Sequence, residues 1–189
     1  ALGTITDVAS AASVAREAGA LVYVDAVHYA PHRLLDAAAL GADFIACSPY
    51  KFYGPHLGVL WGRHALLESI DVPRLPTAPS TAPERLAAAA VEWIASLAGE
   101  GATLRGRLML AFGLLHEREQ ALFRRLWDEL GAVAGVRRFG PPPGASRTGT
   151  VAITLGDRPS SGVARALAGH DCWVSDGDFY ASTIAERCG

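Results

Sequence analysis

"GALVYVDAVHYAPHRLLDAAALGADFIACSPYK", residues 19–51, contains two short apolar runs that are separated by one helical segment. The runs ALVYVD (20–25) and DFIACS (43–48) have the continuous apolar character of buried parallel strands. Between them, HRLLDAAALG (32–41) predicts a short helix that ends at Gly41. Alternation of helices and strands is typical of an α/β sheet, so this stretch decides the fold class.

The flanking segments extend the same pattern. Upstream, TDVASAASVAREAG (6–19) predicts a helix capped by Thr6 or Asp7, and downstream GVLWG (58–62) predicts a third strand. Residues 71–83 carry four prolines and are interpreted as a linker. Two helices are predicted after it, over residues 83–99 and 102–130, the second from leucines at helical spacing.

The second half of the chain predicts a smaller α+β unit. Its elements are a strand in TVAITLG (150–156), a helix in SSGVARALAG (160–169), a strand in CWVS (172–175) and a helix in ASTIAERCG (181–189). We therefore expect a partial large domain, mostly a parallel sheet with flanking helices, over residues 1–99 that includes the linker helix. A truncated small α+β domain follows over residues 100–189.

The composition excludes several classes of protein. A net charge of −2 and a pI near 6.3 favour neither a nucleic acid nor an anionic membrane as partner. Three cysteines without short spacing argue against a disulfide framework and a cysteine-based zinc site, and they favour a reducing, cytoplasmic setting. We see no apolar run of about 18 residues and no signal peptide. Both ends look cut, so we expect a fragment of a longer protein.

Polar residues follow both apolar runs at the point where each strand should end. Asp25 and His28 follow the first run, and Ser48, Tyr50 and Lys51 follow the second. In open α/β sheets, ligands bind outside the carboxyl ends of the strands. We therefore expect the two clusters to lie within reach of one ligand.

Lys51 is the only lysine of the chain, and every other basic residue apart from histidine is an arginine. A primary amine in a partly dry cleft is an activated nucleophile that forms Schiff bases with aldehydes. Pyridoxal phosphate needs such a lysine together with a carboxylate that holds the proton of its ring nitrogen. Asp25 is placed to supply that carboxylate.

The neighbouring side chains suggest further contacts with the same cofactor. A neutral His28 can hydrogen-bond the cofactor's 3-oxygen, and Ser48 and Tyr50 carry hydroxyls that phosphate oxygens accept. We interpret His32 and His56 as structural.

The residues TITDV, AREAGALVYVDAVHYAPHR and LGADFIACSPYKFYGPHLGVLWGR together resemble the class V aminotransferase family of fold type I pyridoxal-phosphate enzymes. The chain is most similar to the cysteine desulfurase-like subfamily. The resemblance is dense over residues 2–64 and resumes in RTGTVAITL and VSDGDFYASTIAERCG. Its strongest signal is the Asp-x-x-His motif followed by Ser-x-x-Lys.

The resemblance implies specific roles. It gives Lys51 the internal aldimine and general acid-base work at the substrate's α-carbon, Asp25 the pyridine nitrogen, His28 the cofactor oxygen and Ser48 a phosphate contact. Tyr50 stands where many desulfurases have a histidine. The resemblance also implies a homodimer acting on a small amino acid.

Thr81, within Ser80-Thr81, is the nearest candidate for the family's Gly-Thr pair, which reaches the phosphate of the neighbouring subunit.

The sequence departs from the family in what surrounds these residues. From the resemblance we expect the family's phosphate loop and ring-stacking residue to precede Ala1, and its carboxylate-binding arginine to follow Gly189. No cysteine has the His-Cys-Ala-like context of a desulfurase nucleophile. We expect Cys47 and Cys172 to be inert thiols buried in strands.

Two alternatives stay open. In the first, the chain is an inactive remnant, which would bind pyridoxal phosphate poorly and expose an apolar sheet edge that promotes aggregation. In the second, Ser48-Pro-Tyr-Lys51 is the Ser-x-x-Lys motif of a serine hydrolase with Ser48 as nucleophile. That motif needs a helix start, whereas here an apolar run precedes it and Gly-Pro follows.

Overall fold

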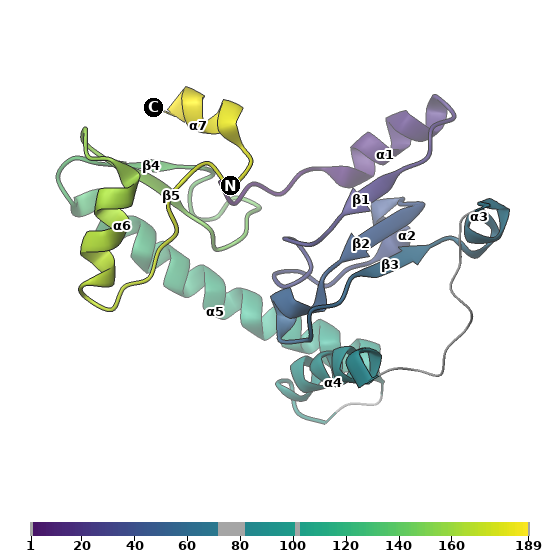
Figure 1. Ribbon diagram of the computed structural model, residues 1–189. Helices are drawn as coiled ribbons and strands as arrows, with labels where there is room; N and C mark the ends of the chain where they lie inside the picture. Colours follow the sequence, from purple (N-terminus) through teal and green to yellow (C-terminus); the bar gives the residue numbers. More distant parts are fainter. Residues whose placement is uncertain (1, 72–81, 101–102, 189) are drawn as a thin grey trace. The chain divides into compact units, whose positions relative to one another are not determined.

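The computed structural model describes residues 2–71, 82–100 and 103–188 (Figure 1). The chain divides into two compact units, which we describe separately. The three-stranded unit is Thr6–His116, and the two-stranded unit comprises Ala1–Ile5 and Glu117–Gly189. The division falls within one long helix, whereas the sequence suggests a boundary after residue 99. The assignment of two domains, 1–99 and 100–189, stays a prediction.

The three-stranded unit contains β1 (Tyr23–Asp25), β2 (Phe44–Cys47) and β3 (Val59–Gly62) in the order β1-β2-β3. β1 and β2 are parallel, as predicted, with Asp25 opposite Ala46, and β3 runs antiparallel to β2. All three predicted strands are confirmed.

The burial expected for the first strand is wrong. Tyr23 is 60% exposed and Asp25 is exposed, because β1 pairs with β2 on only one side among the described strands. Val59, Leu60 and Trp61 of β3 are also exposed, so the predicted apolar sheet edge is present.

Three short helices precede, separate or follow the strands along the chain. The predicted helix α1 (Val8–Glu17) begins after Asp7, whose carboxylate accepts a hydrogen bond from the Ser10 amide at 3.0 Å. The predicted helix α2 (Ala37–Leu40) ends at Gly41 in the left-handed conformation. Helix α3 (His64–Ser69) was not predicted from the sequence.

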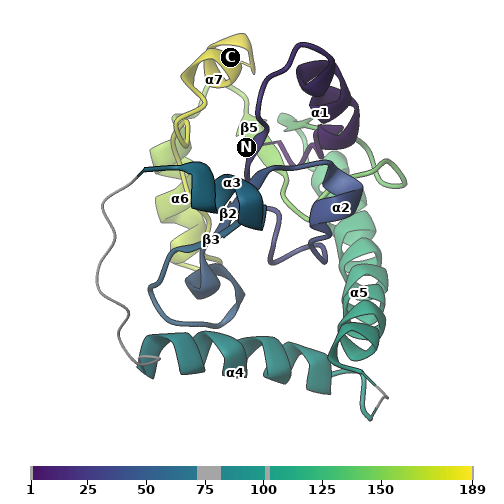
Figure 2. The ribbon, with the colours of Figure 1, turned by 90° about the vertical axis from the view of Figure 1, so that its right-hand side faces the viewer.

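The predicted long helices are α4 (Ala82–Ser96) and α5 (Leu104–Ala132). Figure 2 shows α4 ending near the start of α5. Their contact forms one core, made of Ile94, Ala95, Leu108 and Ala111 with Leu34 and Phe52 packed against it. A second core is made of Ala26, Ala42 and Ile45, of which Ile45 belongs to β2.

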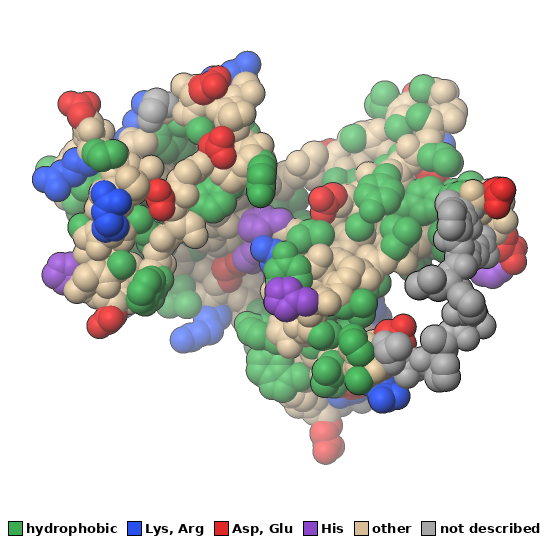
Figure 3. All heavy atoms as spheres, viewed as in Figure 1, with side chains coloured by type: hydrophobic (Ala, Val, Ile, Leu, Met, Phe, Trp, Pro, Cys, Tyr) green, Lys and Arg blue, Asp and Glu red, His purple; other side chains and the backbone are tan. Residues whose placement is uncertain are grey.

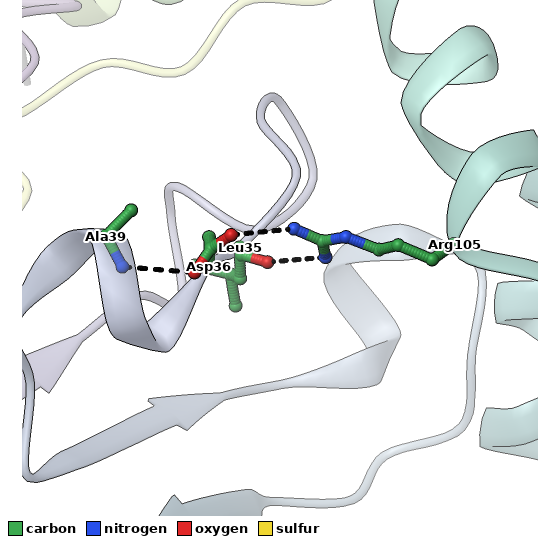
Figure 4. Close-up of polar contacts among 4 residues, drawn as sticks. All are labelled: Leu35, Asp36, Ala39 and Arg105. Atoms are coloured by element: carbon green, nitrogen blue, oxygen red, sulfur yellow. Dashed lines mark hydrogen bonds and ion pairs between the residues drawn. The ribbon is translucent and has the colours of Figure 1, made fainter.

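Arg105 joins the start of α5 to the start of α2 (Figure 4). Its guanidinium donates to the Leu35 carbonyl at 2.9 Å and to the Asp36 carboxylate at 3.2 Å. The other oxygen of Asp36 caps α2 by accepting from the Ala39 amide at 3.0 Å. Asp36 thus explains why α2 begins later than the predicted residue 32, and it links two segments that are distant in sequence.

The two-stranded unit contains β4 (Val136–Phe139) and β5 (Ala152–Leu155) as an antiparallel pair, with α6 (Ser160–Ala168) and α7 (Ser182–Cys188). β5, α6 and α7 are confirmed, and β4 was not predicted.

The predicted strand over residues 172–175 is wrong. The Cys172 amide donates instead to the Leu167 carbonyl and closes the end of α6, with Asp171 at φ 57°. This backbone direction leaves Trp173 82% exposed and Cys172 exposed, so Cys172 is not the buried thiol we expected.

None of the helices formed by residues 2–71, 82–100 and 103–188 combines the length and the hydropathy that crossing a membrane requires.

Candidate functional site

The carboxyl ends of β1 and β2 lie side by side. Because the two strands are parallel with Asp25 opposite Ala46, the polar residues that follow both strands emerge at one edge of the sheet. This is the arrangement expected from the sequence. It brings together the segment that carries His28 and the segment that carries Ser48, Tyr50 and Lys51.

Asp25 is the last residue of β1, and its carboxylate forms a local turn. One oxygen accepts a hydrogen bond from the Val27 amide at 2.9 Å, which is the side-chain turn that aspartate commonly makes. The backbone continues with the Ala30 amide donating to the Ala26 carbonyl at 2.8 Å. These bonds position the carboxylate and lead the chain directly to His28.

His28 lies in the turn after Asp25, with its ring centroid 5.4 Å from that of His32. Burial of part of its surface lowers the pKa of His28, and the positive charges of His32 and Lys51 lower it further. The neutral imidazole is therefore favoured, and it can both donate and accept a hydrogen bond.

Ser48 leads from β2 into the one-turn 3₁₀ helix η1 (Pro49–Phe52). Pro49 is buried at the first position of this turn, where its missing amide hydrogen costs nothing. Tyr53 ends η1 at φ 69°, and the Gly54 amide donates to the Pro49 carbonyl at 2.8 Å. The turn carries Lys51 just beyond the end of β2.

Gly54 is required by this turn. A Cβ atom at residue 54 would lie 2.7 Å from the Cβ of Pro49 and 3.0 Å from its carbonyl oxygen. The glycine therefore lets the backbone approach Pro49 closely enough to close the turn.

Lys51 is exposed, and its Nζ lies 5.2 Å from the centroid of the Tyr50 ring. Asp25 and His28 are exposed as well. The partly dry cleft that the sequence predicts around Lys51 is therefore not formed by the described residues of this chain. Those residues supply one edge of the sheet and leave the opposite side of the cluster open to solvent.

The set of functional groups fits pyridoxal phosphate. The cluster offers one primary amine for an aldehyde, one carboxylate for a ring nitrogen, a neutral imidazole for a phenolic oxygen and the Ser48 hydroxyl for a phosphate. The fit lies in the chemistry of the donors and in their placement at one sheet edge. Thr81, the remaining predicted contact, lies outside the described residues.

The geometry argues against the serine hydrolase alternative. Ser48 and Lys51 are joined by a backbone bond, in which the Lys51 amide donates to the Ser48 carbonyl at 3.0 Å. However, η1 is a single 3₁₀ turn and not the start of an α-helix. The motif therefore lacks the helix on which that nucleophile depends.

The contact of His56 with Tyr50 was not predicted from the sequence. Its ring stacks on Tyr50 with centroids 4.8 Å apart and planes at 7°. The residues are separated by a left-handed turn at Tyr53, so no periodic pattern in the sequence could indicate the stack.

Cys47, at the end of β2, is half-buried, and burial raises the pKa of its thiol. The raised pKa favours the protonated thiol, which is unreactive, as the sequence suggested. Cys47 lines an apolar cavity of about 140 Å³ together with Leu34, Phe52 and Ile94.

Another hollow lies beside α4, where hydrophobic side chains gather at the surface (Figure 3). It is lined by Tyr53, Leu86 and Trp93.

This chain is similar to proteins of one known family. The family profile Aminotransferase class-V matches residues 1–188. A probable cysteine desulfurase from Streptomyces coelicolor is 32% identical over 200 residues, covering 100% of this chain and 48% of the relative. An aminotransferase-like protein from Gibberella zeae is 35% identical over 172 residues, covering 88% and 43%.

The fold has relatives among solved structures as well. The apo cysteine desulfurase from Thermococcus onnurineus superposes with a TM-score of 0.63 at 26% identity, covering 94% of this chain and 47% of that one. The chain thus spans about half the length of the relatives it matches. Class V aminotransferases are pyridoxal-phosphate-dependent. The chain belongs to the class V aminotransferase family and is cysteine desulfurase-like.

Proposed function

We propose that this chain is the lysine-bearing part of a pyridoxal-phosphate enzyme that acts on a small amino acid. The observation that supports this most strongly is the position of Lys51. The only primary amine among the side chains follows β2, at the sheet edge where the parallel strand β1 ends in Asp25. An arginine cannot replace this amine, since a guanidinium stays protonated and does not attack aldehydes.

Each residue of the cluster has a proposed task. Lys51 holds the cofactor covalently through Nζ, and Asp25 holds the proton of the ring nitrogen. His28, favoured as the neutral imidazole, hydrogen-bonds the ring oxygen. Ser48 and Tyr50 donate to the phosphate, and Thr81 donates to the phosphate of a neighbouring subunit.

The bound cofactor supplies an electron sink for the pair of electrons left at the substrate's α-carbon. The protein's own contribution is proton transfer and orientation. Lys51 Nζ, when not bound to the cofactor, would take a proton from that carbon or return one to it. Asp25 keeps the ring nitrogen protonated during this transfer.

We propose that the enzyme is a homodimer, as its resemblance to the family implies. The three free cysteines suit a reducing compartment, and we place the enzyme in the cytoplasm.

The test uses the whole protein that contains this chain. After incubation with pyridoxal phosphate, borohydride reduction fixes the cofactor on the amine to which it is attached, and peptide mass spectrometry locates it. We expect a single modified peptide containing Lys51 and no modification in Lys51→Arg. Attachment elsewhere, with Lys51 unmodified, would refute the proposal.

A matched control moves the lysine within the three-stranded unit. The double variant Lys51→Arg/Arg63→Lys places an amine at an exposed position beside Asp43, where Arg63 now lies 3.2 Å from the carboxylate. We expect no selective attachment there, because neither Asp25 nor His28 is adjacent in the register of the sheet. Attachment equal to that at Lys51 would show that any exposed lysine suffices.

The remnant alternative is tested by the 189-residue chain alone. Its lysine cluster is open to solvent, so we expect it to hold the cofactor weakly. A stable yellow complex of the isolated chain that disappears in Lys51→Ala would contradict this expectation.

A further inference from the structure

Three side chains from the connection between β2 and β3 form a stack. The Lys51 ammonium lies over the Tyr50 ring, 5.2 Å from its centroid. The Tyr50 ring lies on the His56 ring, with centroids 4.8 Å apart and planes at 7°. Tyr50 therefore contacts both Lys51 and His56.

The backbone of the connection makes this stack possible. Tyr53 at φ 69° turns the chain back, and the Gly54 amide closes the turn on the Pro49 carbonyl. Buried Pro49 anchors the turn at its start. The chain therefore returns to Tyr50 six residues later in a fixed geometry, and His56 meets the tyrosine ring from a defined direction.

Lys51 and Tyr50 both need such support. A lysine side chain has four flexible bonds, and Lys51 is exposed, so its amine would otherwise sample many positions. An aromatic face attracts an ammonium group within about 6 Å of its centroid. Tyr50 is itself 43% exposed, so its ring provides a stable face only if another group restrains it.

We propose that His56 is a positioning residue for Lys51: it holds the Tyr50 ring, and the ring holds the Lys51 amine at the carboxyl end of β2. This inference rests on the proposed function, in which that amine holds the cofactor. His56 acts through Tyr50 and takes no part in the chemistry.

Nuclear magnetic resonance tests the stack without any cofactor. In the whole protein without cofactor, ¹³C-labelled lysine gives a set of signals from which Lys51→Arg removes those of Lys51. A ring current shifts nuclei above an aromatic face upfield, so the ε-methylene signals of Lys51 should be displaced from those of free lysine. We expect Tyr50→Leu to abolish this displacement and His56→Ala to remove most of it.

Two further variants separate stacking from other effects. His56→Phe keeps an aromatic ring and should retain most of the displacement. His64→Ala changes an exposed histidine that pairs with Glu68 in α3, and it should leave the displacement unchanged. Full displacement in His56→Ala, or none in the unsubstituted chain, would overturn the inference.

The rate of cofactor attachment in the whole protein gives a second readout. We expect His56→Ala to slow attachment about two- to fivefold and His56→Phe to restore it. An unchanged rate in His56→Ala would also overturn the inference. If borohydride mapping shows no attachment at Lys51 while the ring-current displacement depends on His56, the proposed function fails and the positioning by His56 stands.

Discussion

Lys51 and Arg147 both lie on aromatic rings, and their surroundings differ. Lys51, in the three-stranded unit, is exposed and lies 5.2 Å from the Tyr50 centroid. Arg147, in the two-stranded unit, is fully buried, with its guanidinium carbon 3.6 Å from the Phe123 centroid. Its guanidinium also donates to the carbonyls of Thr148 and Thr150.

The difference separates a chemical role from a structural one. Burial lowers the pKa of Arg147, and the negative charge of Glu119 opposes that effect. A guanidinium nevertheless stays charged inside a protein and satisfies several carbonyls at once. An amine that must react needs access to its substrate. The comparison predicts that Arg147 contributes to stability and that Lys51 contributes almost nothing to it.

The largest effect on stability should come from Arg147→Ala. This variant leaves the carbonyls of Thr148 and Thr150 without their donor and opens a cavity beneath Phe123, so we expect the free energy of unfolding to fall by about 3 kcal/mol. Urea denaturation followed by tryptophan fluorescence measures the loss, since Trp127 lies beside the guanidinium. Lys51→Arg should change the free energy of unfolding by less than about 0.5 kcal/mol.

A matched control for Arg147 lies on α5. Arg125 is exposed and pairs with Glu129 one turn away at 2.8 Å. Arg125→Ala should give an unfolding curve that overlays that of the unsubstituted protein. Equal losses in the two arginine variants would show that burial of Arg147 is not the cause.

Features that depend on residues close together in the sequence could be predicted, whereas features that depend on distant residues could not. The strands β1 and β2, the caps at Asp7 and Gly41, and the cluster around Lys51 all follow from local patterns, and each was predicted. The exposure of Tyr23 was not predicted, because it depends on whether another strand covers β1. Residues 172–175 look like a strand, yet their backbone closes α6 instead.

Two other elements and one contact show no clear pattern in the sequence, and they were not predicted. β4 has the sequence VRRF, in which charged residues interrupt the apolar pattern, and its pairing with β5 alone makes it a strand. α3 is only six residues long. The Tyr50–His56 stack depends on a left-handed residue that is not glycine, and tyrosine gives no indication of that conformation.

An intermediate effect is expected at Asp36, which is exposed but bound on two sides. Asp36→Ala removes the cap of α2 and the ion pair with Arg105, so we expect a loss of about 1–2 kcal/mol in the free energy of unfolding. Arg105→Ala should cost less, because the cap remains. A double-mutant cycle measures their coupling, and a loss from Asp36→Ala as small as that from Lys51→Arg would contradict the structural role.

The smallest effect concerns Asp7, a fully exposed charge held only by its own helix. The Ser10 hydroxyl and then the Ser10 amide donate to the carboxylate and lower the pKa of Asp7. A carboxyl with a lowered pKa in the folded state stabilises that state above its unfolded pKa, about 3.9. The contribution disappears as the pH falls through the folded value.

Asp7→Asn keeps a capping side chain but cannot titrate. We therefore expect the unsubstituted protein to lose α1 stability relative to Asp7→Asn as the pH falls below the ordinary aspartate range, measured as amide hydrogen exchange in α1. At neutral pH the two proteins should differ little. If their pH dependence is the same, the hydrogen bonds of Ser10 do not distinguish the charged from the neutral carboxyl. An exposed charge would then contribute to stability only where, as at Asp36, it links two separate segments of the chain.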